Sequence, residues 1–310
     1  MGPDEPRSGE NTSLRSVAST GSARGYTIYG DLRTRETMAL ATVLHAKGLA
    51  VELVEETASL ALSLASRAGS EEGPYLRTPE GFVLAELHAM LELIERVHPE
   101  PALVPSTPVR RICVRLLEDW LELWLPHWPR RSWRTLERLG DHLAAAGFLL
   151  GARPTRADWI LAAWLETEVL PHAHARAHLS ARAPRLVSLG EELLSASLAS
   201  GAGADDVIPI SLLAVLEEIA ADYHVYLARN HQALKDHESH VRLDLGLGPQ
   251  SLPLQPVAER RRTEIGREIA ALDRSARRRV VEVLEPMGAW HVLTLPAVLA
   301  DLDPADPRSL

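Results

Sequence analysis

The first hundred residues alternate between short apolar runs and amphipathic stretches. YTIY at residues 26–29 is a β-rich run, and VELV at residues 51–54 has the period-two character of a strand. Between them, apolar residues at helical spacing predict a helix over Arg35–Ala46, with Thr34 as its N-cap and Gly48 at its end. The chain therefore opens with a predicted strand, helix and strand.

A second helix and a hairpin continue this pattern. SLALSLASRAG at residues 59–69 predicts a short helix, while residues 73–78 and 81–86 predict two strands joined by a turn at Pro79-Glu80-Gly81. Residues 86–97 form a predicted helix because their apolar residues recur at helical spacing. The predicted order is β-α-β-α-β-β-α.

After a proline-rich linker the pattern becomes helical. Amphipathic helices are predicted over residues 109–125, 132–147, 154–170, 185–197, 208–234, 256–272 and 276–288. A small hairpin is predicted over residues 241–256. The arginine runs at 260–262 and 277–279 are interpreted as solvated helix faces.

Composition and charge exclude several classes of protein. The 310 residues carry a net charge of −9, and nucleic acid is not expected as a partner because phosphate binding needs a basic surface. The single cysteine, Cys113, excludes an intrachain disulfide framework and zinc sites built from several cysteines. No apolar run reaches the roughly 18 residues of a membrane span, and residues 1–24 have no signal-peptide character. We therefore expect a cytoplasmic protein with no membrane partner.

Four stretches, in this order, resemble parts of a glutathione S-transferase. YGDLRTRETMALATVLHAKGL resembles the first strand, active-site turn and first helix, and GPYLRT resembles the strand preceded by a cis-proline. GFVLAELHAMLELIE resembles the last strand and third helix of the thioredoxin-like domain. GARPTRADWILAAWL resembles the buried helix of the family, with a capping box from Thr155 to Asp158. The resemblance covers roughly residues 25–195.

This resemblance implies an α/β thioredoxin-like N-terminal domain followed by an all-α C-terminal domain, here with extra helices. The expected segments are a disordered leader (1–24), the thioredoxin-like domain (25–98), a linker (99–105), the all-helical domain (106–200) and a C-terminal helical extension (207–303). The extension resembles one found in some bacterial relatives, and the resemblance gives it no role.

Thr34 is the candidate catalytic residue that the resemblance implies. A hydroxyl at the start of the first helix in this family donates to the thiolate of glutathione, and the helix dipole favours the same anion. Arg33 and Arg35 would favour a thiolate, whereas Asp31 and Glu36 would oppose one. Thr34 is also explained as an N-cap, and the two roles can coexist.

Four further positions correspond to the family's glutathione contacts. Pro74 resembles the cis-proline whose flanking backbone pairs with the cysteinyl part, and Tyr75 beside it faces either the ligand or the core. Glu86 matches the acid that pairs with the γ-glutamyl amine, although a glutamate at a helix start also suits the dipole. Leu87 replaces the serine that holds the γ-glutamyl carboxylate. Losing that hydrogen bond costs about 1.5–3 kcal/mol, so glutathione binding is expected to be weakened.

Trp120 and Trp124 are candidates for an apolar substrate wall. They recur with Trp128 at four-residue spacing, which suits either such a wall or core packing. Histidines such as His174 and His178 also stand four residues apart, but the resemblance puts them at an exposed helix end. No metal is therefore expected.

These features favour an enzyme that resembles a glutathione S-transferase. Its substrate would be a small apolar electrophile or biosynthetic intermediate, as in secondary metabolism, and glutathione or another small thiol would be its cosubstrate. Thiol-independent isomerase, lyase or cyclase chemistry is left open because the serine is absent. The alternative is a non-catalytic binding or scaffold protein that retains the fold. The family implies a homodimer.

Overall fold

The structure is a computed structural model that describes residues 25–55, 57–126, 133–196, 198, 205–246 and 248–298. The predicted leader over residues 1–24, Trp128 and the last residues of the predicted extension lie outside the described residues. The strands are β1 (Tyr26–Tyr29), β2 (Val51–Val54), β3 (Tyr75–Arg77), β4 (Val83–Leu84), β5 (His240–Leu243) and β6 (Gln250–Pro253).

Most of the remaining described residues are helical. The α-helices are α2 (Arg35–Ala46), α3 (Ala58–Ala68), α4 (Leu87–Val97), α5 (Pro108–Asp119), α6 (Trp133–Ala146), α7 (Arg156–Trp164), α8 (Ala173–Arg182), α9 (Pro184–Ser195), α10 (Leu212–Ile219), α11 (Val225–Lys235), α12 (Pro256–Ala271), α13 (Arg274–Leu284) and α14 (Ala289–Leu293). Three π-helical segments continue α-helices, η1 (Trp120–Trp124), η2 (Leu165–Val169) and η3 (Ala220–His224).

The chain divides into two compact units. The first combines Met1–Ala102 with Leu161–Ser200, and the second combines Leu103–Ile160 with Gly201–Leu310. Helix α7 passes from the second unit into the first. The second unit therefore groups α5 and α6 with the helices of the predicted extension, whereas the domain boundaries expected from the sequence stay predictions.

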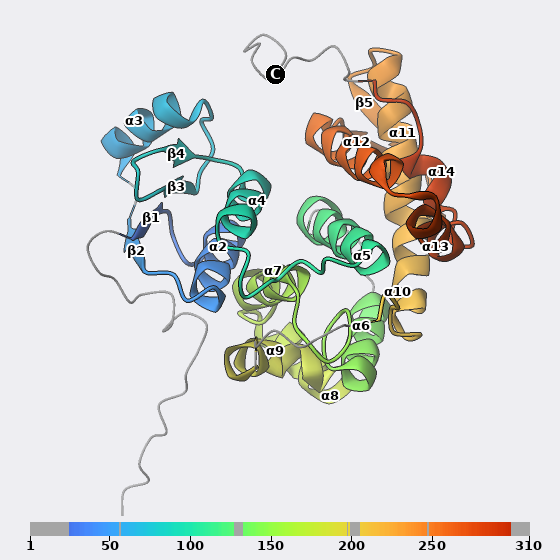
Figure 1. Ribbon diagram of the computed structural model, residues 1–310, viewed down its shortest axis with the longest axis horizontal. Coiled ribbons are helices and arrows are strands. Elements are labelled where there is room, and N and C mark those ends of the chain that lie inside the picture. The colour runs from blue at the N-terminus through green and yellow to red at the C-terminus, as the bar shows by residue number, and fades with distance from the viewer. Residues whose placement is uncertain are drawn as a thin grey trace, which may run out of the picture. The chain divides into compact units, whose positions relative to one another are not determined.

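A four-stranded mixed sheet forms the centre of the first unit. Its order is β2-β1-β3-β4, with β1 parallel to β2 and antiparallel to β3, and β3 antiparallel to β4. With the intervening helices, this is the thioredoxin-like order that the sequence predicts (Figure 1). The predicted fold class, an α/β thioredoxin-like domain joined to a mainly helical remainder, is confirmed.

Both faces of this sheet are covered. Tyr29 and Tyr75 are paired across β1 and β3 and pack with Leu64 of α3 in one cluster. Because neighbouring strand residues point to opposite faces, Ile28 and Leu76 face the other side, and both are fully buried. Helices α2 and α4 lie side by side on that side (Figure 1). The sheet is thus a rigid support for the loops at its edges.

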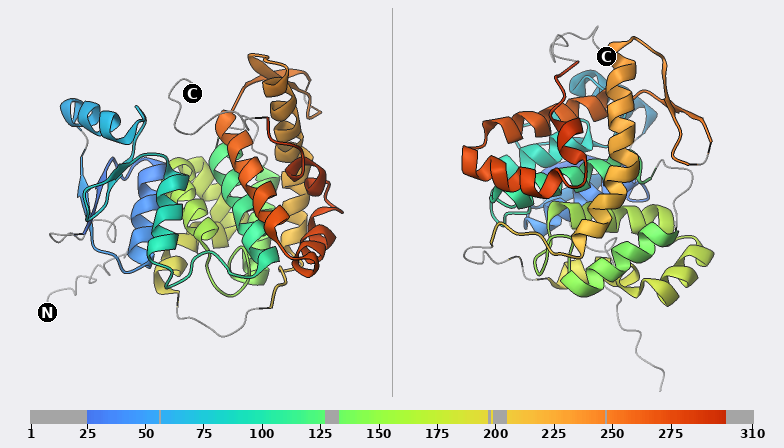
Figure 2. Two further views of the ribbon diagram at one scale, coloured as in Figure 1. Left: turned by 45° about the horizontal axis from the view of Figure 1, so that its top comes forward. Right: turned by 90° about the vertical axis from the view of Figure 1, so that its right-hand side faces the viewer.

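The core of the second unit is built on α5. Helix α5 packs against α12 and α13, while α10 contacts α6 and α11 contacts α12 (Figure 2). Asp206 accepts hydrogen bonds from the backbone N–H groups of Val109 (2.8 Å) and Arg110 (3.3 Å), at the start of α5. The predicted hairpin is present as β5 and β6.

The arginine run at 260–262 is only partly a solvated face, so that prediction is wrong for two of its residues. Arg261 and Arg262 are 4% and 1% exposed, and they pair with acidic side chains inside the second unit. Arg262 binds Glu259 through Nη2 at 2.6 Å. Buried charges need such partners, and a run of like charges in sequence does not reveal them. Residues 277–279 are exposed as predicted.

The predicted capping box at Thr155 is present in a modified form. The Asp158 carboxylate accepts from the Thr155 backbone N–H at 2.7 Å, as expected. The Thr155 hydroxyl also donates to this carboxylate at 2.8 Å, instead of accepting from the helix backbone. Asp158 further accepts from the Leu149 N–H at 2.7 Å, so it joins the start of α7 to the preceding loop. Among the described residues, no helix is long and apolar enough to cross a membrane.

Candidate functional site

One edge of the sheet in the first unit gathers most of the candidate residues. It is formed by the end of β1, the start of β3 and the end of β4, because β3 runs antiparallel to both neighbours. Gly30 lies at its centre, where a Cβ atom would be 2.5 Å from the Thr37 hydroxyl and 3.1 Å from Pro74. Only glycine allows this approach. Helices α2 and α4 both begin at this edge, so both positive helix ends are there.

Thr34 is exposed at this edge and precedes the first residue of α2. Its hydroxyl lies 2.8 Å from the Asp31 carbonyl oxygen and 2.8 Å from the Thr37 hydroxyl. A carbonyl can only accept, so Thr34 donates its proton to Asp31 and accepts from Thr37. The hydroxyl makes no cap bond to α2. Thr34 is thus the N-cap residue of α2 by position, as the sequence predicts, but its side chain does not cap the helix.

The two neighbouring arginines differ in their environment. Arg33 is exposed and paired with Asp31, its Nε donating at 2.7 Å, and this pairing raises the pKa of Arg33. Arg35 is 8% exposed, pairs with Glu36 and lies 3.6 Å from Glu168 of η2. The Nε of Arg35 is buried and has no hydrogen-bond partner among the described residues. Nη1 also has no hydrogen-bond partner among the described residues, so Arg35 keeps two unused donors close to the start of α2.

Pro74 begins the approach to β3, and the Gly73–Pro74 peptide bond is cis, as the resemblance predicts. Tyr75 is fully buried in the cluster with Tyr29 and Leu64, and its hydroxyl donates to the Ser70 carbonyl at 3.2 Å. The sequence left open whether the Tyr75 side chain faces the ligand or the core, and in the structure it faces the core. Its backbone remains at the edge beside Pro74.

Glu86 has the backbone feature that distinguishes this edge. Its φ is 69° and its ψ is 110°, a conformation rarely adopted by residues other than glycine. Its side chain is exposed and does not cap α4. Such backbone strain persists only where the surrounding structure imposes it, and it gathers at functional sites. The observation therefore supports a functional role for Glu86.

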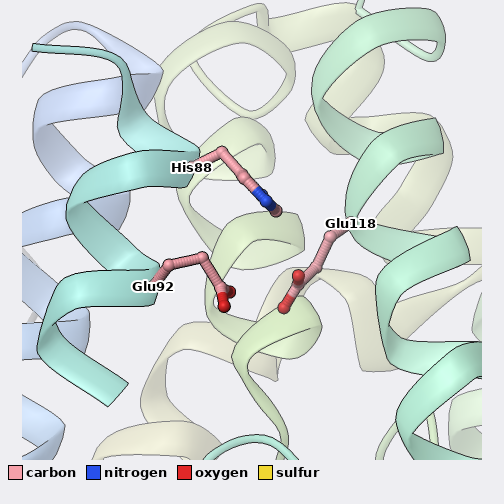
Figure 3. Close-up of side chains that lie close together, drawn as sticks. All are labelled: His88, Glu92 and Glu118. Atoms are coloured by element: carbon pink, nitrogen blue, oxygen red, sulfur yellow. The ribbon is translucent and has the colours of Figure 1, made fainter. Parts of the chain in front are cut away.

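Leu87 is the first residue of α4, and its side chain is 5% exposed. It contributes to the core beside α2, so it offers only its backbone N–H to the edge. Figure 3 shows His88 and Glu92 projecting from successive turns of the same helix. His88 is half-buried and follows Leu87 directly. The start of α4 therefore presents backbone donors and no hydroxyl.

Trp120 and Trp124 lie in η1 of the second unit, apart in the chain from the edge residues. They are 2% and 4% exposed. The ring of Trp124 lies 5.7 Å from that of Tyr223 and 4.9 Å from that of Tyr226, centroid to centroid. This packing favours the core interpretation for Trp124, and a substrate wall stays a prediction.

Glu118, drawn in Figure 3, projects from α5 and belongs to a buried ion pair of the second unit. Arg156 donates to it twice at 2.7 Å, through Nε and Nη2, and both side chains are fully buried. This bidentate geometry is the strongest form of the arginine–carboxylate contact. Within its unit, Glu118 is therefore a structural residue.

Sequence reasoning missed three features of the edge. They are the backbone conformation of Glu86, the Thr37 hydroxyl that donates to Thr34, and the approach of Glu168 to Arg35. The spacing of Thr34 and Thr37, one helical turn apart, is the one signal that could have indicated their contact.

No protein-family model matches the sequence, and no curated protein matches it either. Solved structures do match. A glutathione S-transferase of Methylobacterium radiotolerans in complex with glutathione sulfonate is 20% identical, with 59% of this chain and 99% of that chain covered and a TM-score of 0.42.

Two eukaryotic structures give similar values. The Tau class glutathione S-transferase of mango, Mangifera indica, is 17% identical, with 61% and 95% covered and a TM-score of 0.47. The Omega 3C glutathione transferase of Trametes versicolor is 19% identical, with 63% and 97% covered and a TM-score of 0.46. All three are glutathione S-transferases, the family that the sequence resembles. Identities this low say nothing of activity, and the strand order and the edge residues carry the argument from here.

Proposed function

We propose that the chain is a glutathione S-transferase-like enzyme whose first unit binds glutathione or another small thiol weakly at the sheet edge. The observation that carries the proposal is the strained backbone of Glu86, at the uncapped start of α4 and on the same edge as Thr34 and Pro74. A scaffold that had lost its ligand would have no use for this strain.

The residues present suit the α-amine and the α-carboxylate of a γ-glutamyl group. The exposed Glu86 carboxylate would pair with the amine, and the backbone N–H groups at the start of α4 would hold the carboxylate. The backbone beside Pro74 would pair with the cysteinyl part, as the family resemblance implies. Because Leu87 supplies no hydroxyl, affinity is expected to be about 10- to 100-fold below that of a site with serine.

A bound thiol would supply the nucleophile, and Thr34 would stabilise its anion. To do so, the Thr34 hydroxyl turns its proton from the Asp31 carbonyl toward the sulfur, while Thr37 continues to donate to the Thr34 oxygen. The positive end of α2 and the unused Nε of Arg35 favour the same anion. The proposed acceptor is a small apolar electrophile or biosynthetic intermediate.

Thiol-independent chemistry at the same edge is the second form of the proposal. Here Thr34, Arg33, Arg35 and Glu86 would bind or polarise a substrate that isomerises, eliminates or cyclises. The observation that favours it is the Thr34 proton, which is already engaged by a backbone carbonyl. We also propose, on the resemblance alone, a cytoplasmic homodimer, which sedimentation velocity can test.

Calorimetric titration with glutathione, together with turnover of a generic electrophile with and without it, tests the proposal. Millimolar or tighter binding with thiol-dependent turnover supports the transferase, and turnover without binding supports the thiol-independent enzyme. If the chain neither binds glutathione nor turns over the electrophile, the scaffold alternative is supported. Glu86→Gln is expected to weaken binding, whereas Glu71→Gln, an exposed glutamate in the same unit, serves as the matched control.

A further inference from the structure

A pocket lies in the helical region that follows residue 205, within the second unit. It has a volume of about 580 Å³ and lies between one face of α11 and the residues from α14 to Val298. Small-molecule sites usually have volumes of about 300–1,000 Å³. The pocket contains no residue of the edge in the first unit, so what it binds is independent of the function proposed above.

The α11 side of this pocket is basic. Arg229, His231 and Lys235 line it from α11, and His291 lines it from α14. Among the described residues that line the pocket, none is acidic. Arg229 and Lys235 are exposed, so their charges are available to a ligand. A protein with a net charge of −9 thus has a locally positive pocket.

The opposite side is apolar and follows α14 without a break. Leu295, Pro296, Ala297 and Val298 form it, and Ala228 adds a methyl group from α11. A charged ligand head would therefore lie against α11, and an apolar tail would lie against the 295–298 segment. This division of the lining predicts an amphipathic ligand.

A buried ion pair holds these two sides in place. The Glu259 carboxylate lies 3.1 Å from Nδ1 of His231, and Arg262 donates to it through Nε at 2.7 Å and Nη2 at 2.6 Å. Arg262 also donates to the carbonyl oxygens of Val292 and Leu295, both at 3.0 Å. One buried pair thus fixes both the histidine and the segment that forms the apolar side.

This pair also identifies the ring nitrogen of His231 that donates to Glu259. The Arg262 guanidinium, against the effect of burial, holds the pKa of Glu259 below its usual value, so Glu259 is an ionised acceptor. His231 must then donate through Nδ1, which directs Nε2 away from Glu259. Of the nearby acids, Glu259 is neutralised by Arg262, and Asp236 accepts from the Gln232 amide at 2.7 Å.

We propose that this pocket binds a small organic anion with a short apolar tail. Arg229 and Lys235 contact the anionic head, His231 is the positioned polar group beside it, and the 295–298 segment contacts the tail. A carboxylate and a phosphate ester both suit these donors. The site is preformed, because its histidine and its apolar side share one buried anchor.

Calorimetric titration of the full chain with hexanoate, hexyl phosphate and 1-hexanol tests this proposal. Either anion should bind at least 10-fold more tightly than the alcohol, and the tighter of the two identifies the head group. Raising the salt concentration should weaken binding of the anions and leave binding of the alcohol unchanged. Equal binding of all three ligands, or no binding of either anion, overturns the proposal.

Paired surface variants localise the effect. Arg229→Gln with Lys235→Gln should weaken anion binding at least 10-fold and leave the thermal unfolding temperature unchanged, because both side chains are exposed. Arg242→Gln removes a similar exposed charge from β5 and should have no effect. Equal effects from the double variant and this control would place the anion outside the pocket and so contradict the proposal.

Discussion

At the residue scale, the Thr34 hydroxyl has one proton, for which the Asp31 carbonyl and the proposed thiolate would compete. In the structure the Asp31 carbonyl takes that proton, and Thr37 donates to the Thr34 oxygen. A thiolate would be the stronger acceptor because it is charged, and hydrogen bonds to charged groups contribute about 1.5–3 kcal/mol. The contact with Thr37 would hold the Thr34 oxygen in place while the Thr34 proton turns from the Asp31 carbonyl to the thiolate.

Thr34→Ala is expected to lower the glutathione-dependent kcat/KM by about 10- to 100-fold, because the donor to the sulfur is lost. Thr34→Ser keeps the hydroxyl and should retain most of the activity. Steady-state kinetics with a generic electrophile measures both. If the alanine variant has the activity of the unmodified chain, Thr34 is not a catalytic residue.

Leu87 gives a gain-of-function prediction at the same scale. Leu87→Ser should bind glutathione about 10- to 100-fold more tightly than Leu87→Ala, since both lose the same apolar bulk and only one gains a donor. Both variants should be less stable by about 2–5 kcal/mol, because Leu87 is buried. Titration calorimetry below their unfolding temperatures gives the ratio, and equal affinities would show that the carboxylate is not held there.

At the scale of elements, the end of α5 and the following η1 are joined to α12 by two carboxylates, one from each, that share one guanidinium. Arg261 lies 2.9 Å from Glu122 and 3.3 Å from Asp119, and all three are nearly fully buried. One positive charge cannot neutralise both acids. Asp119 has the longer contact, and burial raises its pKa to about 7 although Arg261 opposes this rise. The cluster thus holds η1 to α12 while one acid remains close to protonation.

Arg261→Met should destabilise the second unit by about 3–5 kcal/mol, because it leaves two buried carboxylates without their partner. The matched control is Arg278→Met. Arg278 pairs with Glu282 on the exposed face of α13, where such pairs contribute about 0.2–1 kcal/mol. Denaturant unfolding compares the two variants, and equal losses would show that the buried cluster contributes no more than a surface pair.

The raised pKa of Asp119 predicts a particular pH dependence. In the unfolded chain this carboxyl has its ordinary pKa of 3.8, whereas in the folded chain burial raises its pKa to about 7. Asp119 therefore stabilises the fold most at low pH, and its contribution is lost as pH rises from about 4 to about 7. The unfolding temperature of Asp119→Asn, relative to that of the unmodified chain, should rise across this window; a constant difference would contradict it.

The strands and the main helices were predictable from the sequence because apolar spacing and local motifs determine them, whereas the cis-proline at Pro74 was predicted from the family resemblance. The φ of Glu86 was not, because it is imposed by the junction between β4 and α4 and leaves no mark in composition. The burial of Arg261 was missed because its partners lie more than a hundred residues away. The pocket at His231 was missed for the same reason, since its two sides meet only in the fold.

At the scale of the whole molecule, the segment after residue 205 belongs to the second unit and is not an appendage to it. Helix α5 lies against α12 and α13, Asp206 accepts from the start of α5, and Arg111 pairs with Glu268. The part of α5 that packs against α12 and α13 would meet water without these helices. Burying apolar area stabilises the fold by about 25 cal/mol per Å². The folding of α5 is therefore coupled to the folding of α12 and α13.

Deleting residues 256–310 should therefore abolish the cooperative unfolding of the second unit and expose apolar surface. Circular dichroism during heating and binding of a dye to exposed apolar surface would report both effects. A deletion variant that unfolds cooperatively at the temperature of the full chain would show that α5 and α6 fold without the later helices.

The three π-helical segments in the described part of the chain have a consequence for tracing its ancestry. In a π-helical segment each backbone N–H bonds to the carbonyl five residues earlier, whereas in an α-helix it bonds to the carbonyl four residues earlier. Each segment therefore contains one residue more than an α-helical turn at the same place. A relative without η1 would differ by a one-residue insertion in mid-helix, where alignment methods place gaps least readily. Evolutionary comparisons of this chain should therefore permit single-residue gaps inside helices at Trp120–Trp124, Leu165–Val169 and Ala220–His224.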